Sequence, residues 1–234
     1  MDIRKAIVFV FQDPRWLVKI VIGDIMIFLS FLIVPVFFLQ GYLIEIIRNV
    51  MRSEEHPLPE WNNWGARFKD GLNLTIAGLI YTLPLWLALC CSGVTFLPAA
   101  MSEGDLTEAT TLLSVSGFSL IACLAFLFLV AYAVIAPAIA IQYAHEDTLA
   151  ATLRFGEVFA IVREHLGDIV LAVVVITVLG VALSLLGLIP LIGWLFSVGI
   201  AIYVFFVTGH LYGQIGAKVG GLPDIIEKLP DDLM

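Results

Sequence analysis

The distribution of lysine and arginine constrains this chain more than any other feature of its sequence. All twelve Lys and Arg residues fall in four blocks, 4–19, 48–69, 154–163 and 218–228. The three stretches between these blocks contain none and consist mainly of Leu, Ile, Val, Phe and Ala. Basic residues near the ends of membrane helices stay on the cytoplasmic side. The pattern therefore predicts a chain that leaves the cytoplasm and returns to it three times.

The overall composition supports this prediction. Of the 234 residues, 61% are hydrophobic and 14% are charged, whereas a soluble domain is about half apolar and about one quarter charged. Besides the first apolar stretch, four segments approach the roughly 20 apolar residues that a helix needs to cross a membrane: 72–96, 112–142, 169–189 and 194–211. The formal net charge of −8 argues against a nucleic-acid partner, because phosphates require a basic face. We therefore expect one domain embedded in the lipid bilayer.

The first apolar stretch, 17–47, is harder to thread than the others. Basic residues flank it on both sides, so it crosses an even number of times if both flanks are cytoplasmic. Pro35 lies near its centre and predicts a helix break at Val34–Pro35. Each arm would then hold roughly 15–17 residues, about 23–26 Å, which is short of the roughly 30 Å hydrocarbon core. We favour a short hairpin, snorkelling or re-entrant, over one long kinked helix with an external N-terminus.

These segments predict an all-α fold, a polytopic integral membrane helical bundle with about six membrane segments in three hairpins. Two amphipathic interfacial helices would lie on the cytoplasmic side, where both termini would also lie. Within a single membrane domain, 1–234, the expected order is an interfacial N-terminal segment at 1–16, a short first hairpin at 17–50, an interfacial helix at 60–71, a second hairpin at 72–143, an interfacial helix at 147–166, a third hairpin at 167–212 and a cytoplasmic tail at 213–234.

The two inner connections carry similar apolar stripes at the spacing i, i+3, i+7 and i+11. The stripes are Trp61, Trp64, Phe68 and Leu72 in the first connection, and Phe155, Val158, Val162 and Leu166 in the second. This spacing places each set on one face of an amphipathic helix. Charged positions align as well, because Lys69–Asp70 matches Arg163–Glu164 at an offset of 94 residues. We interpret the match as an internal repeat, the alternative being that any helix lying beneath a membrane needs such a stripe.

The expected interfacial anchors of these helices are Trp61, Trp64, Phe68 and Phe155, since aromatic side chains concentrate at membrane–water boundaries.

Several sequence runs resemble a known family. They are Phe11-Gln12-Asp13-Pro14-Arg15-Trp16, the run 41–50 from Gly41-Tyr42 to Arg48-Asn49-Val50, Pro57-Leu58-Pro59-Glu60-Trp61, and His210-Leu211-Tyr212-Gly213-Gln214. Together they resemble the prokaryotic membrane proteins grouped as domain of unknown function 4013. The resemblance covers nearly the whole chain, and its most specific part runs from Gly41 to Trp61. It implies an integral protein of a bacterial or archaeal membrane and assigns no reaction, substrate or catalytic residue.

Two residues within the apolar stretches are candidates for function. Asp24 is a possible functional intramembrane acid, because an unpaired carboxylate inside a bilayer is costly; the alternative is a position near the inner interface. His210 is a weak candidate ligand for a pigment or haem, and hydrogen bonding to a neighbouring helix is the simpler interpretation. We predict no other cofactor, and the acidic and histidine clusters at 54–56, 145–147 and 164–165 match no metal motif.

The sequence contains no arrangement typical of an enzyme: no G-x-S-x-G, no P-loop and no zinc-protease motif. Polar residues are sparse in the spans, whereas transporters place polar groups at mid-membrane. We therefore expect a non-catalytic scaffold, assembly factor or accessory subunit that associates with other membrane subunits or with itself. The alternative is a small-solute or ion transporter or channel.

Overall fold

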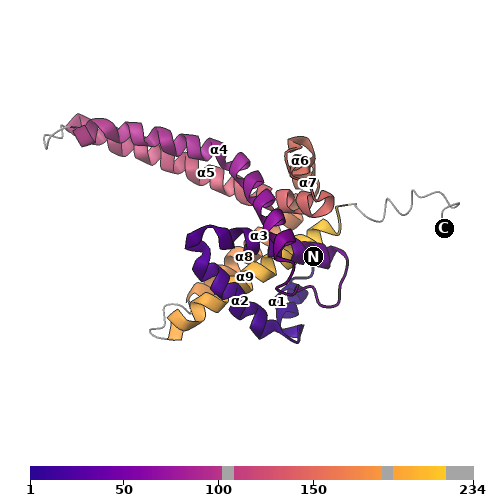
Figure 1. Ribbon diagram of the computed structural model, residues 1–234. Coiled ribbons are helices and arrows are strands. Elements are labelled where there is room, and N and C mark those ends of the chain that lie inside the picture. The colour runs from indigo at the N-terminus through magenta and orange to yellow at the C-terminus, as the bar shows by residue number, and fades with distance from the viewer. Residues whose placement is uncertain (102–107, 186–191, 220–234) are drawn as a thin grey trace.

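The structure is a computed structural model that describes residues 1–101, 108–185 and 192–219, with side chains described at 1–90, 115–185 and 199–219. The described residues are helical and contain no strand (Figure 1). The elements in order are α1 (Ile3–Gln12), α2 (Trp16–Phe28), the 3₁₀ helix η1 (Leu29–Leu32), α3 (Val34–Met51), α4 (Trp64–Met101), α5 (Glu108–Glu146), α6 (Leu149–Thr152), α7 (Phe155–Glu164), α8 (Leu166–Ser184) and α9 (Ile192–Gly216). The predicted all-α class is confirmed.

Four of the described helices are long and apolar enough to cross a bilayer, namely α3, α4, α5 and α8. The chain is therefore a multi-pass membrane protein, as its composition predicts. Residues 102–107, 186–191 and 220–234 lie outside the described residues, and with them the outer ends of the second and third hairpins and most of the predicted tail at 213–234. Helix α4 reaches Met101, so the helical part of the second hairpin is longer than expected.

Helices that follow one another in sequence pack as the pairs α2–α3, α4–α5 and α8–α9. The second members, α3, α5 and α9, all contact one another. Each first member also contacts the second member of another pair: α4 packs on α3, α8 on α5 and α2 on α9. The second members α3, α5 and α9 therefore form a central group, and each first member, α2, α4 or α8, packs against two of them.

The first pair reverses direction one residue before the predicted break. Ile33, between η1 and α3, adopts a φ of 68°, and Pro35 stands in the first turn of α3, where its missing N–H costs nothing. The start of α2 and the end of α3 contact the same loop, because Lys19 donates a hydrogen bond to the carbonyl of Leu58 and Asn49 donates one to the carbonyl of Pro57. The stretch 17–47 thus forms two helices, α2 and α3, that pack against each other, and how often it crosses the membrane stays a prediction.

Two predicted boundaries need correction. No separate interfacial helix spans 60–71, because α4 begins at Trp64 and continues without interruption into the span. The residues ahead of it are held in an extended loop by side chains from other helices, an effect that an apolar stripe does not reveal. The second predicted interfacial helix, 147–166, is two helices, α6 and α7, and α7 is the longer.

Helix α7 has a counterpart in α1 rather than in the 60–71 segment. Each is a ten-residue amphipathic helix that stands immediately before the first member of a pair. Helix α1 contacts α9 and α7 contacts α5, so each packs on the same partner as the helix that follows it. Helices α1–α3 and α7–α9 therefore share an order of elements, and the internal repeat predicted at offset 94 stays a prediction.

Glycine allows the closest helix contacts. A Cβ atom on Gly41 of α3 would overlap the carbonyl oxygen of Arg67, and one on Gly71 of α4 would overlap that of Phe37. On α9, a Cβ on Gly213 would lie 2.5 Å from Cβ of Val50 on α3. Backbones approach this closely only without a side chain between them. The glycines near the end of α9 therefore serve packing within this chain.

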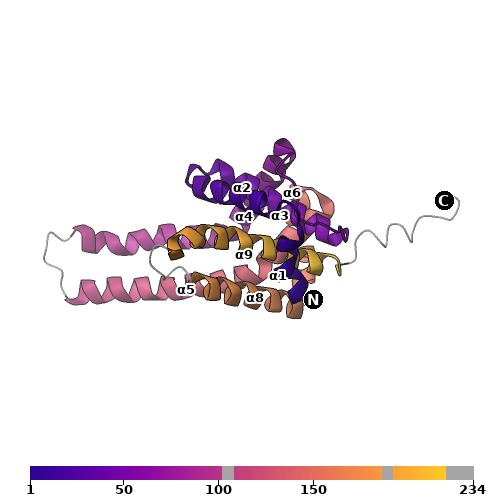
Figure 2. The ribbon, with the colours of Figure 1, turned by 90° about the horizontal axis from the view of Figure 1, so that it is seen from below.

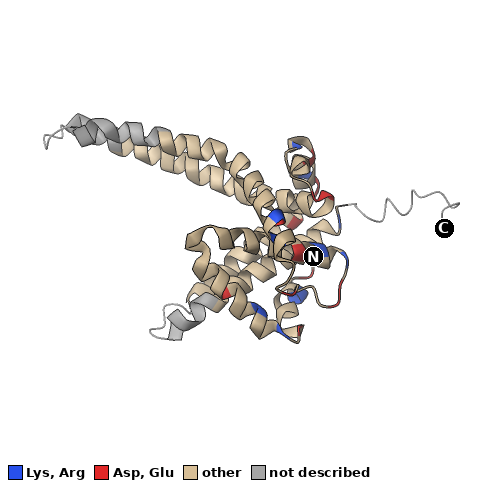
Figure 3. Ribbon diagram, viewed as in Figure 1, with Lys and Arg blue, Asp and Glu red and all other residues tan. Residues whose placement is uncertain are grey.

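Charge separates the molecule into two zones (Figure 3). The described Lys and Arg residues gather at one end, which we call the base, where α3, α5 and α9 end and α4 and α8 begin. From the base, the α4–α5 pair projects as an arm that diverges from the other helices, as Figure 1 shows. Viewed from below in Figure 2, the α4–α5 and α8–α9 pairs extend from the base in the same general direction.

Candidate functional site

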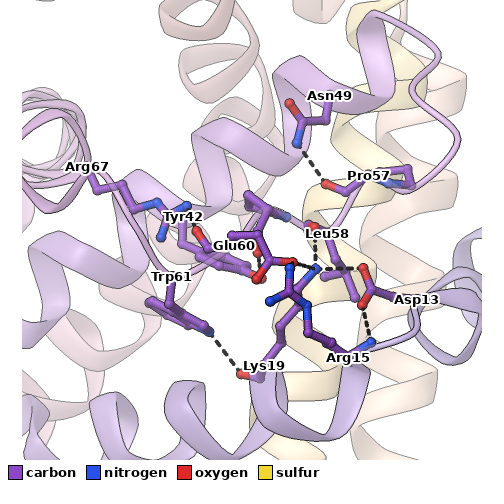
Figure 4. A network of polar contacts seen from close by, with 11 residues as sticks. Asp13, Arg15, Lys19, Tyr42, Asn49, Pro57, Leu58, Glu60, Trp61 and Arg67 are labelled. Atoms are coloured by element: carbon purple, nitrogen blue, oxygen red, sulfur yellow. Dashed lines mark hydrogen bonds and ion pairs between the residues drawn. The ribbon is translucent and has the colours of Figure 1, made fainter.

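The base contains a loop whose carbonyl groups are held by side chains from three helices (Figure 4). Pro57 and Pro59 lack N–H groups and do not fit the interior of a helix. The carbonyls of this segment therefore have no helical N–H donors and need other partners. Four consecutive carbonyl oxygens, those of residues 57–60, each accept a hydrogen bond instead. The donors, in that order, are Asn49 Nδ2 at 3.0 Å, Lys19 Nζ at 2.8 Å, Tyr42 hydroxyl at 2.9 Å and Arg67 Nη2. We call this arrangement the loop clasp.

Lys19 links the loop clasp to a buried ion pair. Its ammonium lies 2.6 Å from a carboxylate oxygen of Asp13 and 2.9 Å from one of Glu60. The side chains of Lys19 and Asp13 are each only 4% exposed. Arg15, more exposed, also pairs with Glu60 at 2.9 Å. Because a buried charge without a partner is costly, this group fixes the turn between α1 and α2 against the loop.

Arg67 occupies the centre of the clasp. Its guanidinium lies 5.1 Å from the ring of Tyr42 and 5.6 Å from that of Trp61, and its Nε donates to Glu45 at 2.7 Å. Trp61 stacks on Tyr42 at 4.2 Å and donates its indole N–H to the backbone of Lys19. Planar cations and aromatic faces attract one another strongly where water is excluded. Arg67 is 2% exposed, so the clasp is part of the protein interior.

A second network joins α3, α4 and α5 on the other side of α3. Arg48 pairs with Asp70 at 2.6 Å and with Asp147 at 2.8 Å. Asp70 also accepts a hydrogen bond from the hydroxyl of Tyr143 at 3.0 Å, which in turn accepts one from Asn73. Together the two networks tie the ends of the hairpins to one another.

The contacts of the two networks hold the helices of the base in place. In the described residues no group of three or more His, Cys, Asp and Glu side chains is placed to hold a metal ion. Lys19, Arg48 and Arg67 pair with carboxylates and backbone carbonyls of the base, which stabilises their present positions. Lys19 and Arg48 are engaged by partners within the chain, whereas Nη1 of Arg67 is buried and has no hydrogen-bond partner among the described residues.

The predicted intramembrane acid, Asp24, lies on α2 facing α9. Its Oδ2 atom is 3.7 Å from the position that a Cβ of Gly199 would take, and its buried Oδ1 has no partner among the described residues. Lys19, the nearest basic residue in the sequence, pairs with Asp13 and Glu60 instead. A functional role for Asp24 stays a prediction.

His210 is packed inside the molecule. It is 1% exposed, its Nδ1 lies 3.0 Å from Nε2 of Gln214, and its ring centroid is 4.4 Å from that of Phe9 on α1. Its Nε2 has no partner among the described residues, but a pigment or haem there would displace packed atoms of α1. Helix packing is the role that this geometry supports.

The predicted anchors separate into two groups. Trp61 belongs to the clasp, and Phe68 packs against Phe37 and Phe38, both at 5.5 Å. Trp64 is 40% exposed and packs against Phe38 at 5.4 Å, and Phe155 is 48% exposed and packs against Tyr81 at 5.0 Å. Their role as anchors at the membrane interface stays a prediction. The role of the clasp residues Lys19, Tyr42, Asn49 and Arg67 was not predicted from the sequence. The prolines at 57 and 59 do indicate a loop whose carbonyls need hydrogen-bond donors.

The comparisons with known proteins agree with the sequence resemblance. The family model described as "Protein of unknown function (DUF4013)" matches residues 26–192. The chain belongs to the DUF4013 family. No curated protein and no solved structure matched the chain. Three of the four clasp donors, and the loop that they hold, lie inside the matched range. The run 41–61, the most specific part of the family resemblance, contains the donors Tyr42 and Asn49 and the loop itself.

Proposed function

We propose that this DUF4013 protein is a non-catalytic integral membrane protein that works by associating with another membrane protein or with a second copy of itself. The observation that carries the proposal is the arm. Although α5 contains a highly apolar window, no residue of that window is buried within the chain. Phe126 and Leu124 are 65% and 57% exposed. A projecting pair of membrane helices offers a large surface for van der Waals contact with other helices.

The proposed topology places the base in the cytoplasm of a bacterial or archaeal cell and the hairpins in its cytoplasmic membrane. The gathering of Lys and Arg at the base supports this orientation. It also supports six membrane segments, with both termini cytoplasmic. Helix α2 has 13 residues, about 20 Å at 1.5 Å per residue. We therefore propose that the α2–α3 hairpin enters the membrane less deeply than the others.

A channel along the middle of the bundle is disfavoured by the packing there. The contacts among α3, α5 and α9 are made by apolar residues and glycines, including Ile44, Ile47, Ala140, Ile141 and Gly213. Ion pathways are instead lined by polar or charged groups. We accordingly propose neither solute transport nor turnover.

Photo-crosslinking from the arm tests the association. p-Benzoylphenylalanine would replace Phe126 on the arm, or Val178 on α8 as a matched control of similar exposure, 62%. In native membranes, Phe126 should give one reproducible protein adduct, either another subunit or a second copy, and Val178 should give lipid adducts alone. Lipid adducts at both positions would contradict the proposal.

Reconstitution provides a second readout. The purified chain in liposomes should release no trapped ion or solute faster than empty vesicles. A saturable flux that Asp24→Asn abolishes would favour the transporter instead.

A further inference from the structure

A groove runs along the inner side of the arm, where the arm diverges from α3 and α9. Its lining comes from four helices, α3, α4, α5 and α9, and its volume is about 420 Å³. Along α4 it extends from Leu74 to Trp86, about 18 Å at 1.5 Å per residue. This volume lies within the range of small-molecule sites, roughly 300–1,000 Å³. The groove is distinct from the exposed outer surface of the arm.

The lining is apolar except for a set of uncharged polar groups. Gln40, Tyr132 and Tyr212 line the groove from α3, α5 and α9, and none of them makes a side-chain hydrogen bond to another described residue. Tyr132 projects its hydroxyl over Gly78, at 3.1 Å from where a Cβ would stand. None of the described residues that line the groove is charged.

Three threonines add acceptors to this set. Thr75, Thr82 and Thr208 line the groove and donate their hydroxyl protons to carbonyls of their own helices, at 2.7, 2.8 and 2.8 Å. The Thr82 oxygen also accepts a hydrogen bond from the indole N–H of Trp86 at 3.2 Å, so each of the three oxygens still offers at least one lone pair. A polar group without a partner in an apolar environment costs free energy, which a bound hydrogen-bonding group would recover.

We propose that the groove binds a neutral, long-chain lipid whose head carries a hydroxyl or carbonyl oxygen. The head hydrogen-bonds to Gln40, Tyr132 and Tyr212, and the chain lies along α4 toward Trp86. A charged head is disfavoured because no lining residue would compensate its charge. Ordinary acyl chains would fill the apolar part of the groove but leave the three polar side chains without partners, which distinguishes a site from bulk lipid.

The experiment uses the full chain in lipid nanodiscs and a hexadecanol analogue that carries a diazirine on its chain. After irradiation, mass spectrometry should place adducts on groove residues such as Leu79, and excess hexadecanol should suppress them. Tyr132→Phe and Gln40→Leu should each weaken this competition, roughly 3- to 10-fold, the effect of one lost hydrogen bond. Tyr81→Phe is the matched control, because the Tyr81 hydroxyl bonds to the carbonyl of Thr152 and does not line the groove; it should behave as the unaltered chain.

Three results would overturn the proposal. Adducts spread evenly over the arm, Phe126 included, would show bulk lipid contact. Equal suppression by palmitate at neutral pH would show that the head need not be neutral. Unchanged competition in Tyr132→Phe and Gln40→Leu, both with unchanged thermal unfolding, would show that these side chains do not recognise the head.

Discussion

Helices α3 and α5 both have the length of a membrane span, yet they meet opposite surroundings. Helix α3 is the less apolar of the two, and more than half of its most apolar window is buried within the chain. Helix α5 is more apolar, and none of the corresponding window is buried. In a soluble protein the more apolar helix would be the buried one. The contrast shows that α3 is packed mainly within the chain, whereas the outer residues of α5 are left to meet lipid or another protein.

The polar residues of α3 explain how it tolerates burial. Tyr42, Arg48 and Asn49 each contact a partner on another element of the base, and Gly41 allows α4 to approach closely. Buried polar groups that are fully paired specify one arrangement of their neighbours. Stability should therefore concentrate around α3 and the base, and the arm should contribute little.

The largest effect is expected at the buried ion pair of the base. Lys19→Met would leave the carboxylate of Asp13 buried without its cation and should lower the free energy of unfolding by about 3–5 kcal/mol. SDS titration from dodecyl maltoside micelles would measure it. Lys5→Met, on an exposed side chain, is the control. A double variant Asp13→Asn/Lys19→Met should recover part of the loss, and no recovery would mean that the pair is not coupled.

Matched truncations compare the two helices directly. Ile47→Ala on α3 removes a fully buried side chain and should cost about 2–4 kcal/mol in the free energy of unfolding. Leu124→Ala on α5, 57% exposed, should cost less than about 0.5 kcal/mol in the same titration. Similar losses at both positions would remove the contrast between α3 and α5.

Glycine substitutions test the close approach of α4 to α3. Gly71→Ala would push a methyl group into the backbone of Phe37 and should cost about 1–3 kcal/mol, measured as a lower thermal midpoint in detergent. Gly180→Ala on α8 has no atom within 4 Å of its new Cβ and is the control. A Gly71→Ala protein as stable as Gly180→Ala would show that the two backbones are not in contact.

The smallest effect is expected from a single donor of the loop clasp. Tyr42→Phe keeps the ring stacked on Trp61 but removes the hydrogen bond to the carbonyl of Pro59. The loss should be about 1 kcal/mol in the free energy of unfolding, together with faster proteolysis of the 52–63 loop. Unchanged proteolysis would mean that the other three donors hold the loop without it.

The membrane class and most helix positions could be predicted from the sequence. The distribution of Lys and Arg and the length of each apolar stretch are local properties that do not depend on tertiary contacts. The break near Pro35 was also predictable, since proline limits its own backbone. The prediction of a separate interfacial helix at 60–71 was wrong, because the apolar spacing of this segment continues into the span of α4. Periodicity alone cannot distinguish a loop residue such as Trp61 from the helix that follows it.

The site could be predicted only in part. Asp24 and His210 stood out because they interrupt apolar runs, but no pattern showed that Lys19 would meet Leu58, 39 residues away. The groove was missed for a related reason. Thr75 and Thr82 are isolated polar residues in an apolar span, and only the packing of four helices brings them together with Gln40, Tyr132 and Tyr212. Long-range pairing of this kind depends on tertiary structure rather than on local sequence.

Cysteine accessibility in intact cells tests the central claim, that the base lies wholly in the cytoplasm, most directly. In a background lacking the native cysteines, single cysteines would replace Gln12, His56 and Glu164, three exposed residues of the base. A membrane-impermeant maleimide should label none of them in intact cells and all of them after permeabilisation. Labelling of the cysteine at position 12 from outside, with those at 56 and 164 protected, would contradict the account, because it would place the two ends of the α2–α3 hairpin on opposite sides of the membrane.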